Sequence, residues 1–564
     1  VKGAVMRTID VVAAALKREG VTFLSCFPTT PVIEAAAQAG IRPIICRQER
    51  TGVGIADGYA RVTNGRGVGA FAMQYGPGAE NAYPGVATAF SDSVPVLLLP
   101  LGHAEDRQGV SPLFSAVHSF ASVTKRVEQI TSPERTTDVL RRALAALRQG
   151  RPGPVMVEIP ADVAVQEVPE PPVAHATIKR TVSGGDPEDV AVAARALCAA
   201  AYPVAIAGQG VLYAEATDDL VALAELLGMP VMSTMLGKSA FPETHGLSLG
   251  CGTSAMSQAL HHFVQRSDTV LAIGTSLTKH VMSMAVPPGK TLIHATNDAV
   301  DVNKDYAADH AIVGDAKLVL RQLVEACSEI VGGGGRRERR ERREGASSEI
   351  AAIDAAWLSA WKARLTSTAR PIDPYRVIWE FMQQIDPHEA IVTHDSGNPR
   401  GQITPFYRAG GPRSYLGWGK SHGLGTGLGL IMGAKLAQPG KFCVNFMGDA
   451  AFGMVGLDFE TAVRHAIPIT TLVLNNSGMT SEANAMPHAE AAFRTSNLGG
   501  NYADVARALG GRAERIEDPE GIAAAIRTAR RLNDDGHPVL LEFVTARTST
   551  SSSAGRGFRP SSGA

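Results

Sequence analysis

The sequence contains few cysteines, and they are scattered. Its 564 residues include six, with no Cys-x-x-Cys spacing among them: Cys26, Cys46, Cys198, Cys251, Cys327 and Cys443. In a chain of this length, scattered thiols predict free or buried cysteines in a reducing compartment. They argue against a disulfide framework and against a zinc site.

The chain also lacks an excess of charge and a long hydrophobic run. Its formal net charge is −1, which gives no indication of a nucleic-acid or anionic membrane partner. No stretch approaches the roughly 18 apolar residues of a membrane span, and the N-terminus lacks a charged-then-apolar signal pattern. We therefore expect a cytoplasmic protein that has no nucleic-acid and no membrane partner.

Apolar runs of strand length alternate with segments of helical spacing along most of the chain. This alternation is typical of the α/β fold class, in which a doubly wound parallel sheet has helices on both faces. We expect three such domains, residues 1–170, 186–330 and 351–548.

Two segments do not fit a domain. Residues 331–350 are rich in glycine, arginine and glutamate, and a helix there would be charged on every face. We predict a solvated linker rather than a nucleic-acid or partner-binding arm, because the arginines are mixed with glutamates. The tail, residues 549–564, is rich in serine, glycine and arginine and is predicted to be flexible.

Residues 441–479 show a strand–helix–strand pattern. Apolar runs at 442–447 and 469–474 flank a predicted helix at 454–465. The two strands should be parallel neighbours. Asp449 and Asn476, which follow them, should then meet at the carboxyl edge of the sheet, where open α/β folds bind ligands.

Asp449 and Asn476 offer hard oxygen ligands of the kind that Mg²⁺ prefers, usually together with phosphate oxygens. Gly448 lets the backbone approach a ligand closely, and Gly478 leaves room for a main-chain carbonyl. A helix beginning after Asp449 would favour a phosphate at its N-terminus. Taken singly, these residues are explained by a turn and a loop, whereas together they indicate a metal–phosphate site.

Gly448-Asp449, followed about 25 residues later by Asn475-Asn476, resembles the cofactor motif of thiamine diphosphate (ThDP) enzymes. The resemblance implies that Asp449, Asn476 and the main-chain carbonyl of Gly478 hold Mg²⁺, which binds the cofactor diphosphate. Ala450 stands where many members have glycine, and only its backbone is expected to matter. The further cofactor-binding positions of this segment are Gly448, Ala450 and Ala451.

Residues 47–61, RQERTGVGIADGYAR, resemble the pyrimidine-binding segment of the same family. Alone, Glu49 between Arg47 and Arg50 is explained by a solvated ion pair. The resemblance implies that Glu49 binds the aminopyrimidine ring and passes it a proton, so that the ring's imino form takes the C2 proton of the thiazolium. A partly buried glutamate with a raised pKa suits this catalytic role.

Residues 76–81 resemble the GPGxxN segment of the acetolactate synthase branch. This implies that Pro77 and Asn81, with Pro28 from an earlier loop, lie against the pyrimidine half of the cofactor. The alternative is a turn that needs glycine for its positive φ.

In the third domain, Ser396, Gly397 and Asn398 follow a predicted strand and should meet the diphosphate. The glycine-rich run 417–433 is predicted to pack closely against the cofactor. Leu424 falls where the family has a bulky apolar wedge that holds ThDP bent. The alternative is a core leucine beneath a glycine-rich turn.

Residues 103–118 are predicted to form a loop at the same edge of the first sheet. In the resemblance this loop faces the substrate from the partner subunit, so His103, Gln108 and His118 are candidate substrate contacts. His422 is a fourth candidate. A solvated side chain is the alternative for each.

Several family members bind FAD in the central domain. Here residues 275–278 replace the usual Arg-Phe-acidic run, and residues 294–298 lack the common acidic pair, which argues against FAD. The resemblance implies a homodimer or homotetramer, with the cofactor between the first domain of one subunit and the third domain of another.

The resemblance further implies that a 2-oxo acid such as pyruvate is decarboxylated and that its acyl carbanion is transferred to a carbonyl acceptor. A decarboxylase or lyase without an acceptor, including one of oxalyl-CoA type, is the alternative. A non-catalytic relative that binds ThDP is a third hypothesis, against which the glutamate at position 49 argues.

Overall fold

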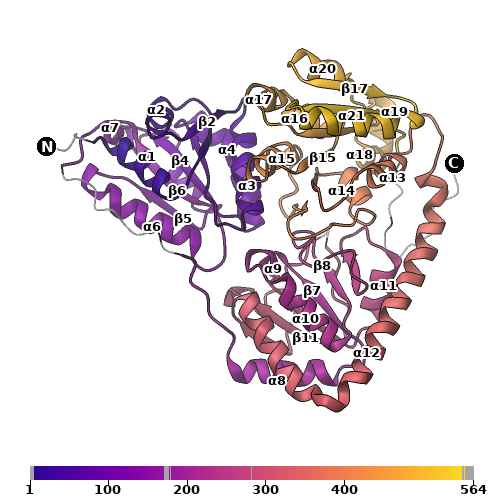
Figure 1. Cartoon of the computed structure of the whole chain (residues 1–564). Coiled ribbons are helices and arrows are strands. Elements are labelled where there is room, and N and C mark those ends of the chain that lie inside the picture. The colour runs from indigo at the N-terminus through magenta and orange to yellow at the C-terminus, as the bar shows by residue number, and fades with distance from the viewer. Residues whose placement is uncertain (1–5, 170–176, 178, 281–282, 549–551, 553–564) are drawn as a thin grey trace.

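The structure is a computed structural model and describes residues 6–169, 177, 179–280, 283–548 and 552. It contains three six-stranded sheets in which every pair of neighbouring strands is parallel, with helices packed around each sheet (Figure 1). The predicted α/β class with three parallel sheets is therefore confirmed. The predicted tail, residues 549–564, lies outside the described residues except for Ser552.

The first sheet is built from residues 23–160. Its strands are β1 (Phe23–Cys26), β2 (Arg42–Ile45), β3 (Gly69–Met73), β4 (Val96–Gly102), β5 (Arg126–Gln129) and β6 (Val155–Pro160). They lie in the order β2-β1-β3-β4-β6-β5. Its helices are α1 (Thr8–Arg18), α2 (Thr30–Gln38), α3 (Glu49–Val62), α4 (Pro77–Ser91), α5 (Ala116–Phe120), α6 (Thr136–Arg148) and α7 (Ala161–Ala164).

The central sheet is built from residues 203–313. Its strands are β7 (Pro203–Ala207), β8 (Val231–Ser233), β9 (Ser248–Cys251), β10 (Thr269–Ile273), β11 (Thr291–Thr296) and β12 (His310–Val313). They lie in the order β12-β11-β10-β7-β8-β9. Its helices are α8 (Pro187–Ala199), α9 (Gln209–Tyr213), α10 (Thr217–Leu227) and α11 (Gln258–Arg266).

The third sheet is built from residues 390–544. Its strands are β13 (Ala390–His394), β14 (Tyr415–Leu416), β15 (Phe442–Gly448), β16 (Thr470–Asn475), β17 (Arg512–Ile516) and β18 (Val539–Val544), in the order β14-β13-β15-β16-β18-β17. Its helices are α13 (Pro374–Gln384), α14 (Asn398–Ile403), α15 (Thr426–Ala437), α16 (Asp449–Val455), α17 (Phe459–Arg464), α18 (Thr480–Ala485), α19 (Pro487–Phe493), α20 (Tyr502–Ala508) and α21 (Ile522–Asp534).

The charged segment 331–350, which we predicted to be a solvated linker, is helical, and most of its described side chains are at least partly exposed. It is part of α12 (Ala316–Leu365), which kinks at Gly332 and runs along the central domain to the third (Figure 1). One side of this segment makes contacts, because Arg342 donates to the main-chain oxygen of Ala200 at 2.9 Å and Arg343 pairs with Glu225 at 3.1 Å. Arginine and glutamate have a high intrinsic helix propensity, and these contacts add to it by fixing one side of the helix to the central domain.

The predicted helix at 454–465 is also corrected. Helix α16 begins earlier, at Asp449, a short 3₁₀ turn follows at residues 456–458, and α17 begins at Phe459. Asp458 accounts for the break, because its Oδ1 accepts hydrogen bonds from the main-chain N–H of Arg47 at 2.7 Å and from the hydroxyl of Thr461 at 2.9 Å. No helix among the described residues combines the length and the apolarity needed to cross a membrane.

The first and third domains touch through the backbones of α3 and α15. A Cβ at Gly58 would lie 2.1 Å from the main-chain oxygen of Leu430, and one at Gly433 would lie 2.1 Å from that of Ile55. The second half of the glycine-rich run therefore packs against α3, whereas we had predicted that the run packs against the cofactor. The two helices run in the same direction across this contact. Gly429 lies against Thr51, and Gly433, four residues later, lies against Ile55, four residues after Thr51.

Replacing Gly433 with alanine should lower the free energy of unfolding by about 1–3 kcal/mol, because α3 and α15 would have to separate to admit a methyl group. The matched control is Gly345→Ala in α12, where no atom lies within 4 Å of the added Cβ. That change should raise stability by about 0.5–1 kcal/mol. Urea unfolding midpoints measure both, and equal shifts in the same direction would contradict the contact.

Candidate active site

A pocket at the carboxyl edge of the third sheet gathers most of the predicted cofactor residues. Strands β13, β15 and β16 are parallel neighbours, so the segments that follow them meet there. The cavity is about 110 Å³ in volume. Its lining includes Ser396, Gly397, Asn398, Leu424, Gly448, Asp449, Ala450, Ala451, Asn476 and Gly478.

The side-chain oxygens of Asp449 and Asn476 converge in this pocket. Asp449 Oδ2 accepts a hydrogen bond from the N–H of Gly478 at 3.0 Å, and Asn476 Oδ1 accepts from the same N–H at 3.1 Å. Burial raises the pKa of Asp449, while the N–H groups of Ala450 and Gly478 favour its charged form. Two hard oxygens side by side suit Mg²⁺, with phosphate oxygens to complete its coordination.

Clusters of three or more His, Cys, Asp or Glu side chains with metal-binding geometry are absent from the described residues. A metal at Asp449 would therefore depend on the carboxamide oxygen, on main-chain carbonyls and on the ligand's own oxygens. That composition fits a diphosphate-bound Mg²⁺ better than a closed structural zinc site, which needs four protein ligands.

Asp395, which sequence reasoning did not single out, fixes the loop that carries Leu424. Its Oδ1 accepts from the N–H groups of Ser396 and Gly425, both at 2.8 Å, and its Oδ2 accepts from Gly427 at 2.9 Å. Burial raises the pKa of Asp395 to about 6, against the effect of these N–H donors. Leu424 both lines the pocket and packs against the neighbouring apolar core, and its role as a wedge stays a prediction.

Glu49 is the first residue of α3 and is only 4% exposed. Burial raises the pKa of its carboxyl, and a hydrogen bond from the Asn81 side chain partly opposes that rise. Pro28 and Pro77 are exposed and follow β1 and β3, which are neighbouring strands. Glu49 follows β2, so all four predicted positions belong to the carboxyl edge of one sheet.

The GPGxxN segment is only partly a turn. Gly76 has a φ of +59°, which supports the predicted need for glycine. Helix α4 then begins at Pro77, a residue suited to the first helical position because its missing N–H has no partner there in any case. Asn81 therefore lies on α4, where it reaches Glu49, rather than in a loop.

The two sets of predicted cofactor residues lie at the edges of different sheets, although the start of α3 approaches the loop of Leu424, since a Cβ at Gly425 would lie 3.2 Å from Nη2 of Arg50. The pocket at Asp449 is lined by third-domain residues, and none of the described first-domain residues is among them. Glu49, Pro28, Pro77 and Asn81 form a separate group.

The four candidate substrate contacts do not form one cluster either. The Gln108 side chain donates to the main-chain oxygen of His103 at 3.4 Å, and Nε2 of His103 is buried without a hydrogen-bond partner among the described residues. His118 lies on α5 with an exposed side chain. His422 is elsewhere, with its ring 5.3 Å from that of His280 in the central domain.

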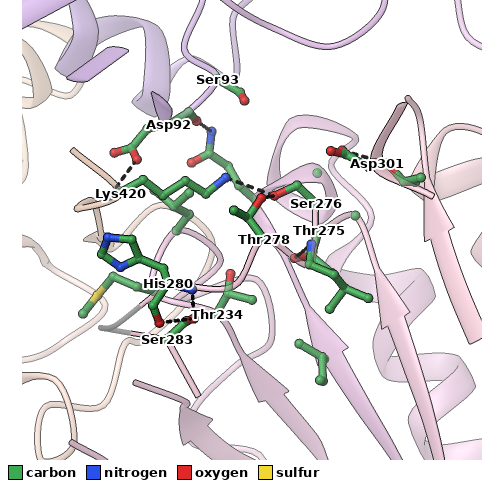
Figure 2. Close-up of a pocket in the computed structure, with 18 of the residues that line it drawn as sticks. Asp92, Ser93, Thr234, Thr275, Ser276, Thr278, His280, Ser283, Asp301 and Lys420 are labelled. Atoms are coloured by element: carbon green, nitrogen blue, oxygen red, sulfur yellow. Dashed lines mark hydrogen bonds between the residues drawn. The ribbon is translucent and has the colours of Figure 1, made fainter. Parts of the chain in front are cut away.

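A second cavity, of about 160 Å³, lies where the three domains meet (Figure 2). It is lined by Asp92 of the first domain, by residues 274–278 of the central domain and by Lys420 of the third. The segment 275–278, from which we argued against FAD, therefore lies at a cavity. That argument stays a prediction. Arg400, which also lines the cavity, carried no signal in the sequence.

Family models match all three parts of the chain. The N-terminal TPP binding domain, the central domain and the C-terminal TPP binding domain of thiamine pyrophosphate enzymes match residues 6–127, 190–323 and 395–543. Thiamine pyrophosphate is another name for ThDP, so the matched domains agree with the residues that suggested this cofactor.

Several similar proteins are acetolactate synthases. A probable acetolactate synthase large subunit of Methanocaldococcus jannaschii is 28% identical over 96% of this chain and 92% of its own length. The acetolactate synthase large subunit of Haemophilus influenzae is 30% identical over 83% of this chain and 82% of its own. An acetolactate synthase of Mycobacterium bovis is 30% identical over 89% of this chain and 82% of its own length. The chain therefore belongs to the thiamine pyrophosphate enzyme family, in its acetolactate synthase branch.

Proposed function

We propose that this enzyme uses ThDP and Mg²⁺ to decarboxylate a 2-oxo acid such as pyruvate and to join the acyl group to a carbonyl acceptor. The observation that carries the proposal is the convergence of Asp449 and Asn476 on one N–H at the sheet edge. The names of the similar proteins support the same reaction class.

The third-domain pocket fits the diphosphate end of the cofactor. Asp449, Asn476 and the main-chain carbonyl of Gly478 would hold Mg²⁺, and residues 396–398 would face the phosphates. Leu424, fixed by Asp395 through Gly425, would support the bent cofactor. When bound, ThDP supplies the carbon nucleophile and the electron sink that decarboxylation needs.

Glu49 supplies the proton transfer in this proposal. Its carboxyl is buried and its pKa is raised, so it holds a proton more readily than a solvated glutamate does. Asn81 fixes its orientation through a hydrogen bond. A carboxyl so placed suits proton donation to a ring nitrogen and proton return.

We also propose that the complete site forms between two copies of the chain, as a homodimer or homotetramer. None of the described first-domain residues lines the Asp449 pocket of the same chain, which supports this. Exposed Pro28, Pro77 and Asn81 around buried Glu49 provide a surface for another copy. Met454 on α16 (53% exposed) and Leu457 in the turn that follows it (62% exposed) are apolar side chains on the surface of the third domain.

Product analysis tests the reaction directly. Incubation with pyruvate, ThDP and Mg²⁺ should yield acetolactate, and omission of ThDP or addition of EDTA should abolish it. Acetaldehyde as the sole product would favour the alternative of a decarboxylase without an acceptor. Untouched pyruvate, with ThDP bound, would exclude pyruvate as the donor.

Glu49→Gln should lower kcat by about 10²–10⁴-fold while leaving ThDP affinity nearly unchanged, because the amide keeps the volume and loses the proton. Isothermal titration with ThDP and a pyruvate-consumption assay separate the two effects. The control is Glu80→Gln, an exposed carboxyl on α4, which should leave both values unchanged. Normal turnover in Glu49→Gln would exclude the catalytic role.

A mixing experiment tests whether the site is shared between subunits. Glu49→Gln and Asp449→Asn, each inactive alone, should regain about a quarter of wild-type activity when randomly mixed as dimers, since each heterodimer holds one intact site. Mixing Asp449→Asn with Asn476→Ala is the control, because both changes affect the same half of the site and recovery should be absent. No recovery in the first mixture would place both halves in one chain.

A further inference from the structure

Two of the six cysteines face each other across a helix contact in the central domain. Cys198 lies in the last turn of α8, and Cys327 lies in the first half of α12. The Sγ atom of Cys198 is 4.0 Å from the main-chain oxygen of Cys327, and the Sγ atom of Cys327 is 4.0 Å from that of Ala194. Because Ala194 lies one helical turn before Cys198, each sulfur points at the helix that carries the other.

The two thiols differ in their access to solvent. Cys327 is buried, whereas Cys198 is partly exposed near the C-terminal end of its helix. The other four cysteines are also buried, and burial raises the pKa of each of them: Cys26, Cys46, Cys251 and Cys443. Cys198 is therefore the one thiol of the six that a dissolved reagent can approach in the folded protein.

An arginine from beyond the kink of α12 lies beside Cys198. Nη2 of Arg339 donates to the main-chain oxygen of Cys198 at 2.5 Å. Its Nη1 is buried and has no hydrogen-bond partner among the described residues. An arginine stays charged even when buried, and a buried donor without a partner is costly. A negative charge on the sulfur of Cys198 would offset that cost.

The surroundings favour a thiolate at Cys198 and a thiol at Cys327. The hydrogen bond that Cys327 donates to Cys198 lowers the pKa of Cys198 to about 7, with a further contribution from the charge of Arg339 and against the effect of burial. The same hydrogen bond, together with burial and the charge of Cys198, raises the pKa of Cys327. The thiolate is the form of cysteine that reacts with oxidants.

We propose that Cys198 is a site of reversible oxidation by hydroperoxides, and that Cys327 then closes a disulfide with it. The Cys198 thiolate attacks one peroxide oxygen and becomes a sulfenic acid, while the O–O bond breaks and the second oxygen leaves, protonated, as water or an alcohol. The Cys327 thiol then attacks this sulfur and loses its proton, so that the S–S bond forms, the S–O bond breaks and water leaves. One peroxide is thereby reduced while two thiols are oxidised to one disulfide.

Oxidation would act on the junction between the central domain and the helix that leads to the third. The disulfide would cross-link α8 to the first half of α12 and remove the thiolate beside Arg339. The part of α12 beyond the kink is tied to the same end of α8, because Arg339 donates to the main-chain oxygen of Cys198 and Arg342 donates to that of Ala200. This modification site does not depend on the proposed reaction.

Peroxide treatment of the full protein, followed by alkylation and peptide mass spectrometry, tests the site. Hydrogen peroxide should join the peptides that carry Cys198 and Cys327, and dithiothreitol should release them. In Cys327→Ala the reaction should stop at a sulfenic acid on Cys198, which dimedone traps. The control is Cys443→Ala, which removes a buried thiol elsewhere and should form the same disulfide as the unchanged protein.

The rate of alkylation by iodoacetamide tests the thiolate. At pH 7 Cys198 should react at least about tenfold faster than the other five cysteines. Arg339→Gln should slow this reaction by about 3–10-fold and move the midpoint of its pH profile upward, whereas Arg339→Lys keeps a charge and should restore most of the rate. The control is Arg337→Gln, an exposed arginine of the same segment that pairs with Glu341 at 3.4 Å, and it should leave the rate unchanged.

Two kinds of result would contradict the inference. A sulfenic acid that persists on Cys198 while Cys327 is present would overturn the disulfide. Alkylation of Cys198 no faster than that of the buried cysteines, or at a rate that does not respond to Arg339→Gln, would overturn the oxidation site. Neither experiment uses pyruvate or ThDP, so failure of this inference and failure of the proposed function are distinguishable.

Discussion

The direct backbone contact between α3 and α15 is the constraint on which the rest of the arrangement depends. Gly58 and Gly433 allow this contact because they have no Cβ. A Cβ at either position would lie 2.1 Å from a main-chain oxygen of the opposing helix. Because the helices run the same way, Glu49 at the start of α3 and Gly425 just before α15 lie at the same end of the contact. The first domain is thereby held in a fixed relation to the loop that Asp395 anchors.

The residues proposed for catalysis belong to the edges of two different sheets. Asp449 and Asn476 belong to the edge of the third sheet and offer oxygens, whereas Glu49 belongs to the edge of the first and offers a proton in a buried setting. In the proposed function neither group would be sufficient for carboligation, since one would position a diphosphate and the other would activate a ring. Assembly of two copies is in this account a condition of catalysis, as well as a source of stability.

The sequence was sufficient to predict the fold class and the residues at the carboxyl edge of the third sheet, because both follow from local patterns. Buried strands read as apolar runs, and the carboxyl ends of parallel strands bring Asp449 and Asn476 together. Strand β17 has no such apolar run, because it is a polar edge strand with exposed alternate residues. The importance of Asp395 was not visible, because it depends on main-chain N–H donors about 30 residues further along the chain.

The measurement that tests the central claim most directly is a crystal structure of the protein with ThDP and Mg²⁺. The account predicts that the diphosphate and metal lie against Asp449, Asn476 and Gly478 of one copy. It predicts that the aminopyrimidine ring lies against Glu49 of a second copy. A ring bound by Glu49 of the same chain, or a diphosphate bound away from Asp449, would contradict it.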